Sequence, residues 1–258
     1  MKTSRTPQFL TLAVLVFFYL PLVVMVIHSF NQSKFGTKWQ GFTWKWYDAL
    51  WQRSDLWDAL LQSLGIAGIS SMASMLLGTA AAISLHRHHT RIQKFHGTLL
   101  ALPLVLPEIL IGMSLLSLFV ALNLRLGFLT VTIAHITFCV GYVAMIIRAR
   151  LQDFDDSILD AARDLGASPW QTWYHVTFPL LMPGILAGGL LAFTLSIDDF
   201  VITFFVSGPG ADTLPLKINS MMRHSKELPV INALSTLLLT GTILLVAFAQ
   251  RLLRIRSI

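Results

Sequence analysis

Six long apolar runs limit the folds open to this chain of 258 residues. A hydrocarbon core about 30 Å thick needs about 20 apolar residues in a helix, because only helices and closed barrels satisfy every backbone group there. None of the runs shows the alternation of a barrel strand. The runs therefore predict an all-α integral membrane protein, a single transmembrane domain over residues 1–258 with six helices. The expected spans are residues 8–30, 60–85, 97–122, 127–147, 180–206 and 229–250.

Composition excludes an ordinary water-soluble enzyme. Hydrophobic residues make up 55% of the chain and charged residues only 12%, whereas a soluble domain carries about 25% charged residues. The single cysteine, Cys139, excludes a disulfide framework and a cysteine-based metal site. The formal net charge of +6 suits either nucleic acid or anionic lipid, and the side of the membrane on which the Lys and Arg residues lie matters more than their total. We expect membrane lipid and no nucleic acid as a partner, and no metal site.

The distribution of basic residues predicts the orientation. Six spans, the first of them retained rather than cleaved, place both termini on one side of the membrane. Eleven of the 19 Lys and Arg residues then lie on the side of the termini and eight on the other. Basic residues near span ends favour the cytoplasm, so we expect both termini to be cytoplasmic.

Residues 150–179, between the fourth and fifth spans, form an amphipathic segment. Apolar and charged residues alternate there at helical spacing, and Gly166 interrupts the pattern. The spacing predicts two short helices, with Ser168 as the cap of the second and Pro169 at its first position. On the residues alone, such a segment lies on lipid or docks into a groove of a partner protein.

The same segment carries a motif. Asp160–Ala161–Ala162, Gly166, Val176 and Phe178–Pro179 resemble E-A-A-x3-G-x9-I-x-L-P, found in the permease subunits of ABC importers. Asp for Glu, Val for Ile and Phe for Leu are mild departures. The resemblance implies a cytoplasmic coupling helix that docks onto the ATPase. Its coupling residues would be Asp160, Ala161, Ala162, Gly166 and Pro179.

Further motifs narrow the resemblance. Together they are similar to permeases of the spermidine/putrescine (PotC/PotI) type, which implies a place in the bacterial inner membrane. The implied partners are a second related permease, two ATPase subunits and a periplasmic polyamine-binding protein. The motifs are SFN from Ser29, GFTWKWY from Gly41, HITFC from His135, DLGA from Asp164, FTLSIDD from Phe193, SGP from Ser207 and LP from Leu214.

The chain contains no nucleotide-binding motif. No G-x-x-x-x-G-K-[ST] occurs, and no Gly is followed by Lys anywhere, so a P-loop is excluded. We therefore expect no catalytic residue and no cofactor in this chain. ATP and magnesium would bind the partner ATPase.

Three acids interrupt the predicted spans: Glu108, Asp198 and Asp199. A mid-membrane Asp costs about 2.5–3.5 kcal/mol unless it faces water or a charge. No Lys or Arg lies in any predicted span, so we expect no partner for these acids within the chain. We favour the interpretation that the acids line a cation route. The alternative is that they lie at the span ends or pair with basic residues of a partner protein. Polyamines carry two or three charges, which match two or three acids. Adjacent helical residues point about 100° apart, so only one of the two Asp residues faces the route squarely unless the helix is irregular; which one stays open.

Three other residues are candidates for the substrate pathway. Ser196, next to the acid pair, would hydrogen-bond an amine or its own helix backbone. Five of the seven Trp residues lie between positions 39 and 57. They form either an interfacial belt or a cation–π site. The interfacial belt is the favoured interpretation; if one aromatic residue touches cargo, we expect it to be Trp46, with Tyr19 in the first span as the weaker candidate.

The sequence thus predicts the permease half of an ATP-driven polyamine importer and leaves putrescine and spermidine unresolved. The alternative within the same class is a permease for another small solute. A secondary transporter usually has an internal repeat, and none is evident here. An intramembrane prenyltransferase needs D-x-x-D spacing for its magnesium, but Ile202 stands three residues after Asp199.

Overall fold

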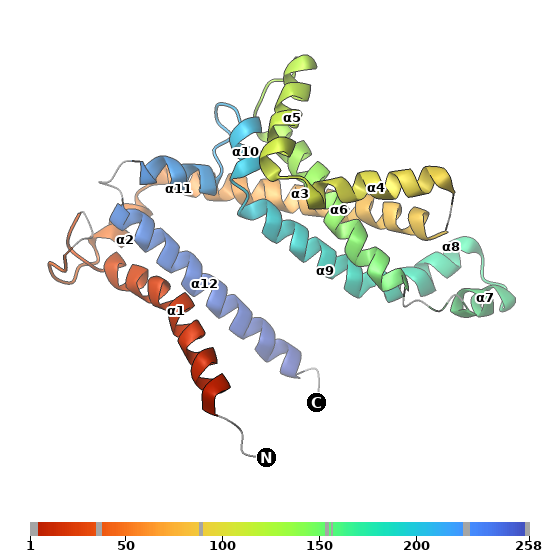
Figure 1. The fold of residues 1–258 in the computed structure, drawn as a ribbon, viewed down its shortest axis with the longest axis horizontal. Coiled ribbons are helices and arrows are strands. Elements are labelled where there is room, and N and C mark those ends of the chain that lie inside the picture. Colours follow the sequence, from red (N-terminus) through yellow and green to blue (C-terminus); the bar gives the residue numbers. More distant parts are fainter. Residues whose placement is uncertain are drawn as a thin grey trace. The chain divides into compact units, whose positions relative to one another are not determined.

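The computed structural model describes residues 5–34, 38–87, 90–152, 155, 157–223 and 228–255. This part of the chain is helical apart from loops and one isolated bridge between Asn31 and Phe42 (Figure 1). The all-α class expected from the sequence is therefore confirmed. The chain divides into two compact units, Met1–Trp57 with Lys217–Ile258, and Asp58–Leu216.

The first unit joins the two ends of the chain. Its helices are α1 (Arg5–Ser29), α2 (Lys45–Trp51), the end of α11 (Leu214–Met222) and α12 (Leu228–Ile255). Helix α12 packs against both α1 and α2 (Figure 1). Asp55 ties this unit together, since Arg53 lies 2.7 Å and Lys217 lies 2.9 Å from its carboxylate.

The second unit contains most of α3 (Ser54–Arg87), followed by α4 (Arg91–Val105), α5 (Glu108–Ala121) and α6 (Phe128–Gln152). It then continues through α7 (Ser157–Asp164), α8 (Pro169–Thr172), the π-helix η1 (Trp173–Thr177), α9 (Phe178–Ile197) and α10 (Val201–Val206). Helix α6 lies at its centre and packs against α9, α4 and α10. A glycine permits the contact with α4, because a Cβ atom at Gly141 would lie 2.3 Å from the carbonyl oxygen of Leu100.

Four helices of the described chain are long and apolar enough to cross a membrane. Three of them, Phe9–Ser29, Ser54–His86 and Phe128–Gln152, coincide with expected spans. The fourth is the continuous helix Pro169–Ile197. Helix α12 covers the expected span 229–250. The part of α12 whose side chains are described is apolar over Leu228–Leu244.

Two expected spans, 97–122 and 180–206, are not single helices. Helices α4 and α5 are bent by 113° relative to each other, because Pro107 has no N–H to continue α4 and favours the extended backbone found at Leu106. The other span is broken after Ile197, where α9 ends, and α10 begins at Val201. Both breaks carry acidic residues.

In the segment 150–179 the structure has one short helix, α7, followed by the start of the continuous helix Pro169–Ile197, so the second of the two expected short helices is not a separate one. Residues 153, 154 and 156 lie outside the described chain. Gly166 ends α7 at φ +85°, and its N–H donates to the Arg163 carbonyl while that of Ala167 donates to the Ala162 carbonyl. This is the hydrogen-bond pattern of a Schellman C-cap, which glycine favours. Ser168 accepts from the Gln171 N–H and Pro169 occupies the first helical turn, so the predicted cap is confirmed.

Candidate functional site

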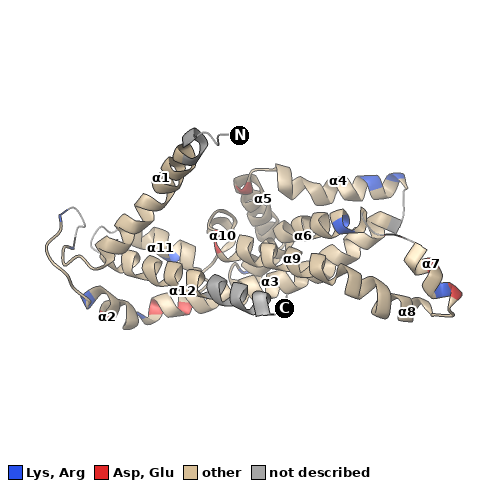
Figure 2. Cartoon of the chain, turned by 90° about the horizontal axis from the view of Figure 1, so that it is seen from below, with Lys and Arg blue, Asp and Glu red and all other residues tan. Residues whose placement is uncertain are grey.

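The three acids of the predicted spans gather where the two helix breaks meet. Glu108 is the first residue of α5, and Asp198 and Asp199 separate α9 from α10. Helix α5 packs against α10 so closely that a Cβ atom at Gly112 would lie 2.8 Å from the Phe205 ring. Figure 2 shows acidic residues at the start of α5 and beside α10.

Asp199 is buried, and its carboxylate is hydrogen-bonded to other residues of the same chain. Its carboxylate accepts hydrogen bonds from the backbone N–H groups of Ile202, at 3.3 Å, and Thr203, at 2.8 Å. The Thr203 hydroxyl donates to it at 2.6 Å. Asp199 therefore caps the short helix α10, supplying acceptors for N–H groups that have no partner within the helix.

His135 is an internal partner of Asp199 that was not predicted from the sequence. Its Nε2 lies 3.2 Å from Asp199 Oδ2 and 2.9 Å from the Thr203 hydroxyl, and its Nδ1 lies 2.6 Å from the Ser196 hydroxyl. Ser196 in turn lies 3.0 Å from the Ser70 hydroxyl. The expectation that the acids lack a partner considered only Lys and Arg and is wrong for Asp199. The buried network joins α3, α6, α9 and α10.

The two neighbouring Asp residues have different surroundings. Asp199 is only 8% exposed, whereas Asp198 and Glu108 are more exposed side chains. The helix ends between Ile197 and Asp198, which is the irregularity needed for two adjacent acids to serve one site. The network holds Asp199 and leaves Asp198 and Glu108 as the carboxylates that a cation can reach.

The network makes His135 a positioning residue with a measurable effect on stability. Replacing His135 by Leu removes both ring nitrogens and leaves Asp199 and Ser196 each short of a buried partner, at a cost of about 1–3 kcal/mol. We expect the thermal unfolding midpoint of the assembled complex to fall by several degrees. His96→Leu, at an exposed position on α4, is the control and should leave the midpoint unchanged. An unchanged midpoint in His135→Leu would show that the network contributes nothing to the fold.

The aromatic candidates Trp46 and Tyr19 lie in the first unit. Trp46 is 8% exposed, its indole N–H donates to the Asn31 carbonyl at 2.7 Å, and Lys45 Nζ lies 4.4 Å from the ring centroid. Tyr19 is 60% exposed on α1. An exposed ring that was not predicted to touch cargo, Trp44, contacts Phe30 nearby, at 4.9 Å between centroids. The role of Trp46 and Tyr19 in substrate passage stays a prediction.

The coupling candidates lie on an exposed surface. Asp160, Ala161, Gly166 and Pro179 are exposed, and Ala162 is half-buried. The Arg163 guanidinium donates to Asp160 at 3.1 Å with both side chains largely in solvent, so this pair adds little stability. The segment also exposes large apolar side chains, which is typical of a protein interaction site: Ile158, Leu165, Trp170 and Tyr174.

A π-helix joins this surface to α9. Pro179 has no N–H to bond to the His175 carbonyl, and its ring crowds that carbonyl in a regular α-helix. The turn widens instead, and the Phe178 N–H bonds to the Trp173 carbonyl five residues earlier. Pro169–Ile197 therefore remains one continuous helix from the exposed segment to the acid pair.

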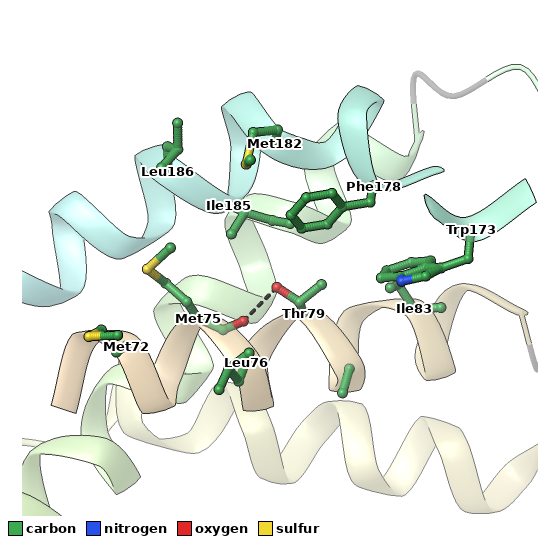
Figure 3. A pocket seen from close by; sticks show the side chains of 11 residues that line it. Met72, Met75, Leu76, Thr79, Ile83, Trp173, Phe178, Met182, Ile185 and Leu186 are labelled. Atoms are coloured by element: carbon green, nitrogen blue, oxygen red, sulfur yellow. Dashed lines mark hydrogen bonds between the residues drawn. The ribbon is translucent and has the colours of Figure 1, made fainter. Parts of the chain in front are cut away.

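A pocket of about 470 Å³ between α3 and the η1–α9 region offers no site for a cation. Its lining in Figure 3 is apolar apart from Thr79, whose hydroxyl donates to the Met75 carbonyl. None of the lining residues that the structure describes is charged. The lining residues are Met72, Met75, Leu76, Thr79, Ala80, Ile83, Trp173, Phe178, Met182, Ile185 and Leu186.

The chain is similar to known transport proteins. It is 44% identical over 252 residues to the putrescine transport system permease protein PotI of Escherichia coli (strain K12), covering 93% of this chain and 88% of that protein. It is 40% identical over 242 residues to the spermidine/putrescine transport system permease protein PotC of the same strain, covering 94% and 91%. These likenesses confirm the resemblance expected from the motifs.

The fold is similar to that of a solved transporter. A chain in the crystal structure of a bacterial ABC transporter involved in the import of the acidic polysaccharide alginate matches with a TM-score of 0.73, at 14% identity, over 97% of this chain and 98% of that chain. Residues 74–256 match the family described as "Binding-protein-dependent transport system inner membrane component". The chain therefore belongs to the family of inner membrane components of binding-protein-dependent transport systems.

Proposed function

We propose that this chain is one permease half of an ATP-driven importer that carries polyamines into the cytoplasm. It would cross the bacterial inner membrane six times, with both termini in the cytoplasm. Its partners would be a second related permease, two ATPase subunits and a periplasmic polyamine-binding protein. The substrate class is supported by the names of the similar permeases, which transport putrescine and spermidine.

One observation carries the proposal. Glu108 and Asp198 are accessible carboxylates at two neighbouring helix breaks. Discontinuous helices expose backbone groups that bind ions within membrane transporters, and acids in membrane segments ordinarily serve such pathways. Two carboxylates match the two positive charges of a diammonium chain.

The continuous helix Pro169–Ile197 supports a coupling mechanism. Its first turns belong to the exposed segment that would contact the ATPase, with Asp160, Ala161, Ala162 and Gly166 as contact residues. Its last turn carries Ser196 and ends beside Asp198. Closure of the ATPase subunits would therefore act through the turn between α7 and α8 and then along one continuous helix to Asp198.

Uptake by cells tests the cargo. Labelled putrescine and spermidine are supplied to cells that lack this chain and retain its partner genes, and then to the same cells with the chain restored. We expect ATP-dependent uptake of at least one polyamine only when the chain is present. Uptake of neither would contradict the polyamine assignment and favour another small solute as cargo.

A further inference from the structure

Two basic side chains line an open pocket in the second unit, where α4 begins and α6 nears its end. Lys94, near the start of α4, and Arg148, near the end of α6, line a space of about 350 Å³ together with Thr90, Gln93 and Thr98. Figure 2 shows basic residues at the start of α4 and on α6. Among the residues that the structure describes, none forms an ion pair with Lys94 or Arg148. The pocket is therefore suited to an anion.

An apolar groove continues from this pocket. It runs between α4 and α6, has a volume of only about 50 Å³, and shares Leu85, Gly97 and Arg148 with the basic pocket. Beyond the shared residues its lining is apolar, with Ala101 and Leu104 on α4. The close approach of α4 to α6 at Gly141 forms its floor.

Helix α4 changes from polar to apolar along one face. Lys94, Gly97, Ala101 and Leu104 are spaced three or four residues apart and line the pocket and the groove in turn. From Lys94 to Leu104 the helix rises about 15 Å, which is half of a hydrocarbon core about 30 Å thick. No residue of α4 is buried within the second unit, so the helix lies at its periphery, where lipid has access.

From this geometry we infer that the surface formed by Lys94, Arg148 and the α4–α6 groove is a binding site for an anionic phospholipid. The phosphate lies between the two cations, and one acyl chain follows the groove through a single leaflet. The groove is too small to enclose the chain, so its other side faces the bilayer. A free phosphate would occupy only the basic pocket and would leave the groove without a ligand. The site is independent of the transported solute.

Native mass spectrometry of the assembled transporter tests the site. The complex is titrated with phosphatidylglycerol or with phosphatidylcholine, and the lipid retained is counted. A cation near a lipid surface contributes about fivefold in affinity, so we expect the double variant Lys94→Gln/Arg148→Gln to bind phosphatidylglycerol about 25-fold more weakly. Binding of phosphatidylcholine should be weak for both proteins. Undiminished binding of phosphatidylglycerol by the double variant would overturn the proposal.

Three further variants test the basic pocket and the groove separately. Arg125→Gln removes an exposed arginine between α5 and α6 and should retain the lipid. Arg148→Lys keeps the charge and should restore most of the binding lost in Arg148→Gln. Ala101→Phe fills the groove without removing a cation and should also lower lipid retention. If Ala101→Phe retains the lipid and inorganic phosphate displaces it, the pocket binds a free anion and the phospholipid assignment is wrong.

Discussion

Polyamine uptake is expected to fall about tenfold or more when Asn replaces Asp198, with the amount of assembled complex unchanged. Asp198 is exposed, whereas the carboxylate of Asp199 is buried and accepts N–H groups at the start of α10. A hydrogen bond to a charged group contributes about 1.5–3 kcal/mol, and about 1.4 kcal/mol corresponds to a tenfold change in binding. The measurement is the initial uptake rate, divided by the amount of complex recovered from the membrane.

Two matched variants make this prediction specific. Asp212→Asn neutralises another exposed carboxylate and should leave uptake unchanged. Asp199→Asn should lower assembly and thermal stability along with uptake, because its carboxylate accepts the N–H groups of Ile202 and Thr203 and contacts His135. A parallel loss of uptake and assembly in Asp198→Asn would instead mark Asp198 as a structural residue.

Hydropathy located the helices of this chain but not their breaks. An apolar run predicts burial in the bilayer, and continuous helix satisfies the backbone there, so residues 97–122 and 180–206 were each expected to form one helix. Proline alone does not mark a break, because Pro21, Pro103 and Pro183 all lie inside helices. Leu106, before Pro107, has extended backbone and ends α4, whereas the other three prolines are accommodated within their helices, and the local sequence pattern does not separate these two outcomes.

The candidate site shows the same division between local and distant contacts. The cap of α8 was predictable because Ser168 and Gln171 are three residues apart and bond to each other's backbone N–H groups. The buried network was not predictable from the sequence, because Ser196 lies 61 residues from His135 and 126 residues from Ser70 along the chain. The acids themselves were found from their cost in a membrane, but their separate surroundings follow from contacts between helices.

Gly166→Asp is expected to uncouple ATP hydrolysis from uptake, with uptake reduced about tenfold or more and insertion and assembly intact. No described atom lies within 4 Å of a Cβ atom at this position, so the new side chain meets nothing in the described part of its own chain. Asp also tolerates the left-handed backbone better than most residues. The added carboxylate would instead be buried unpaired against the ATPase, at a free-energy cost. Hydrolysis and uptake are measured on the same reconstituted complex.

Gly210 provides a matched control for this variant. It has φ +79°, and it too has no described atom within 4 Å of a Cβ position, but it lies in the loop after α10. Gly210→Asp therefore adds the same strain and the same charge outside the segment that would dock, and should leave hydrolysis coupled to uptake. Because the two glycines share a positive φ and open space around the Cβ position, a defect confined to Gly166→Asp would assign the effect to the segment around Gly166 and not to backbone strain or added charge alone. Normal uptake in Gly166→Asp would exclude that residue from the ATPase contact.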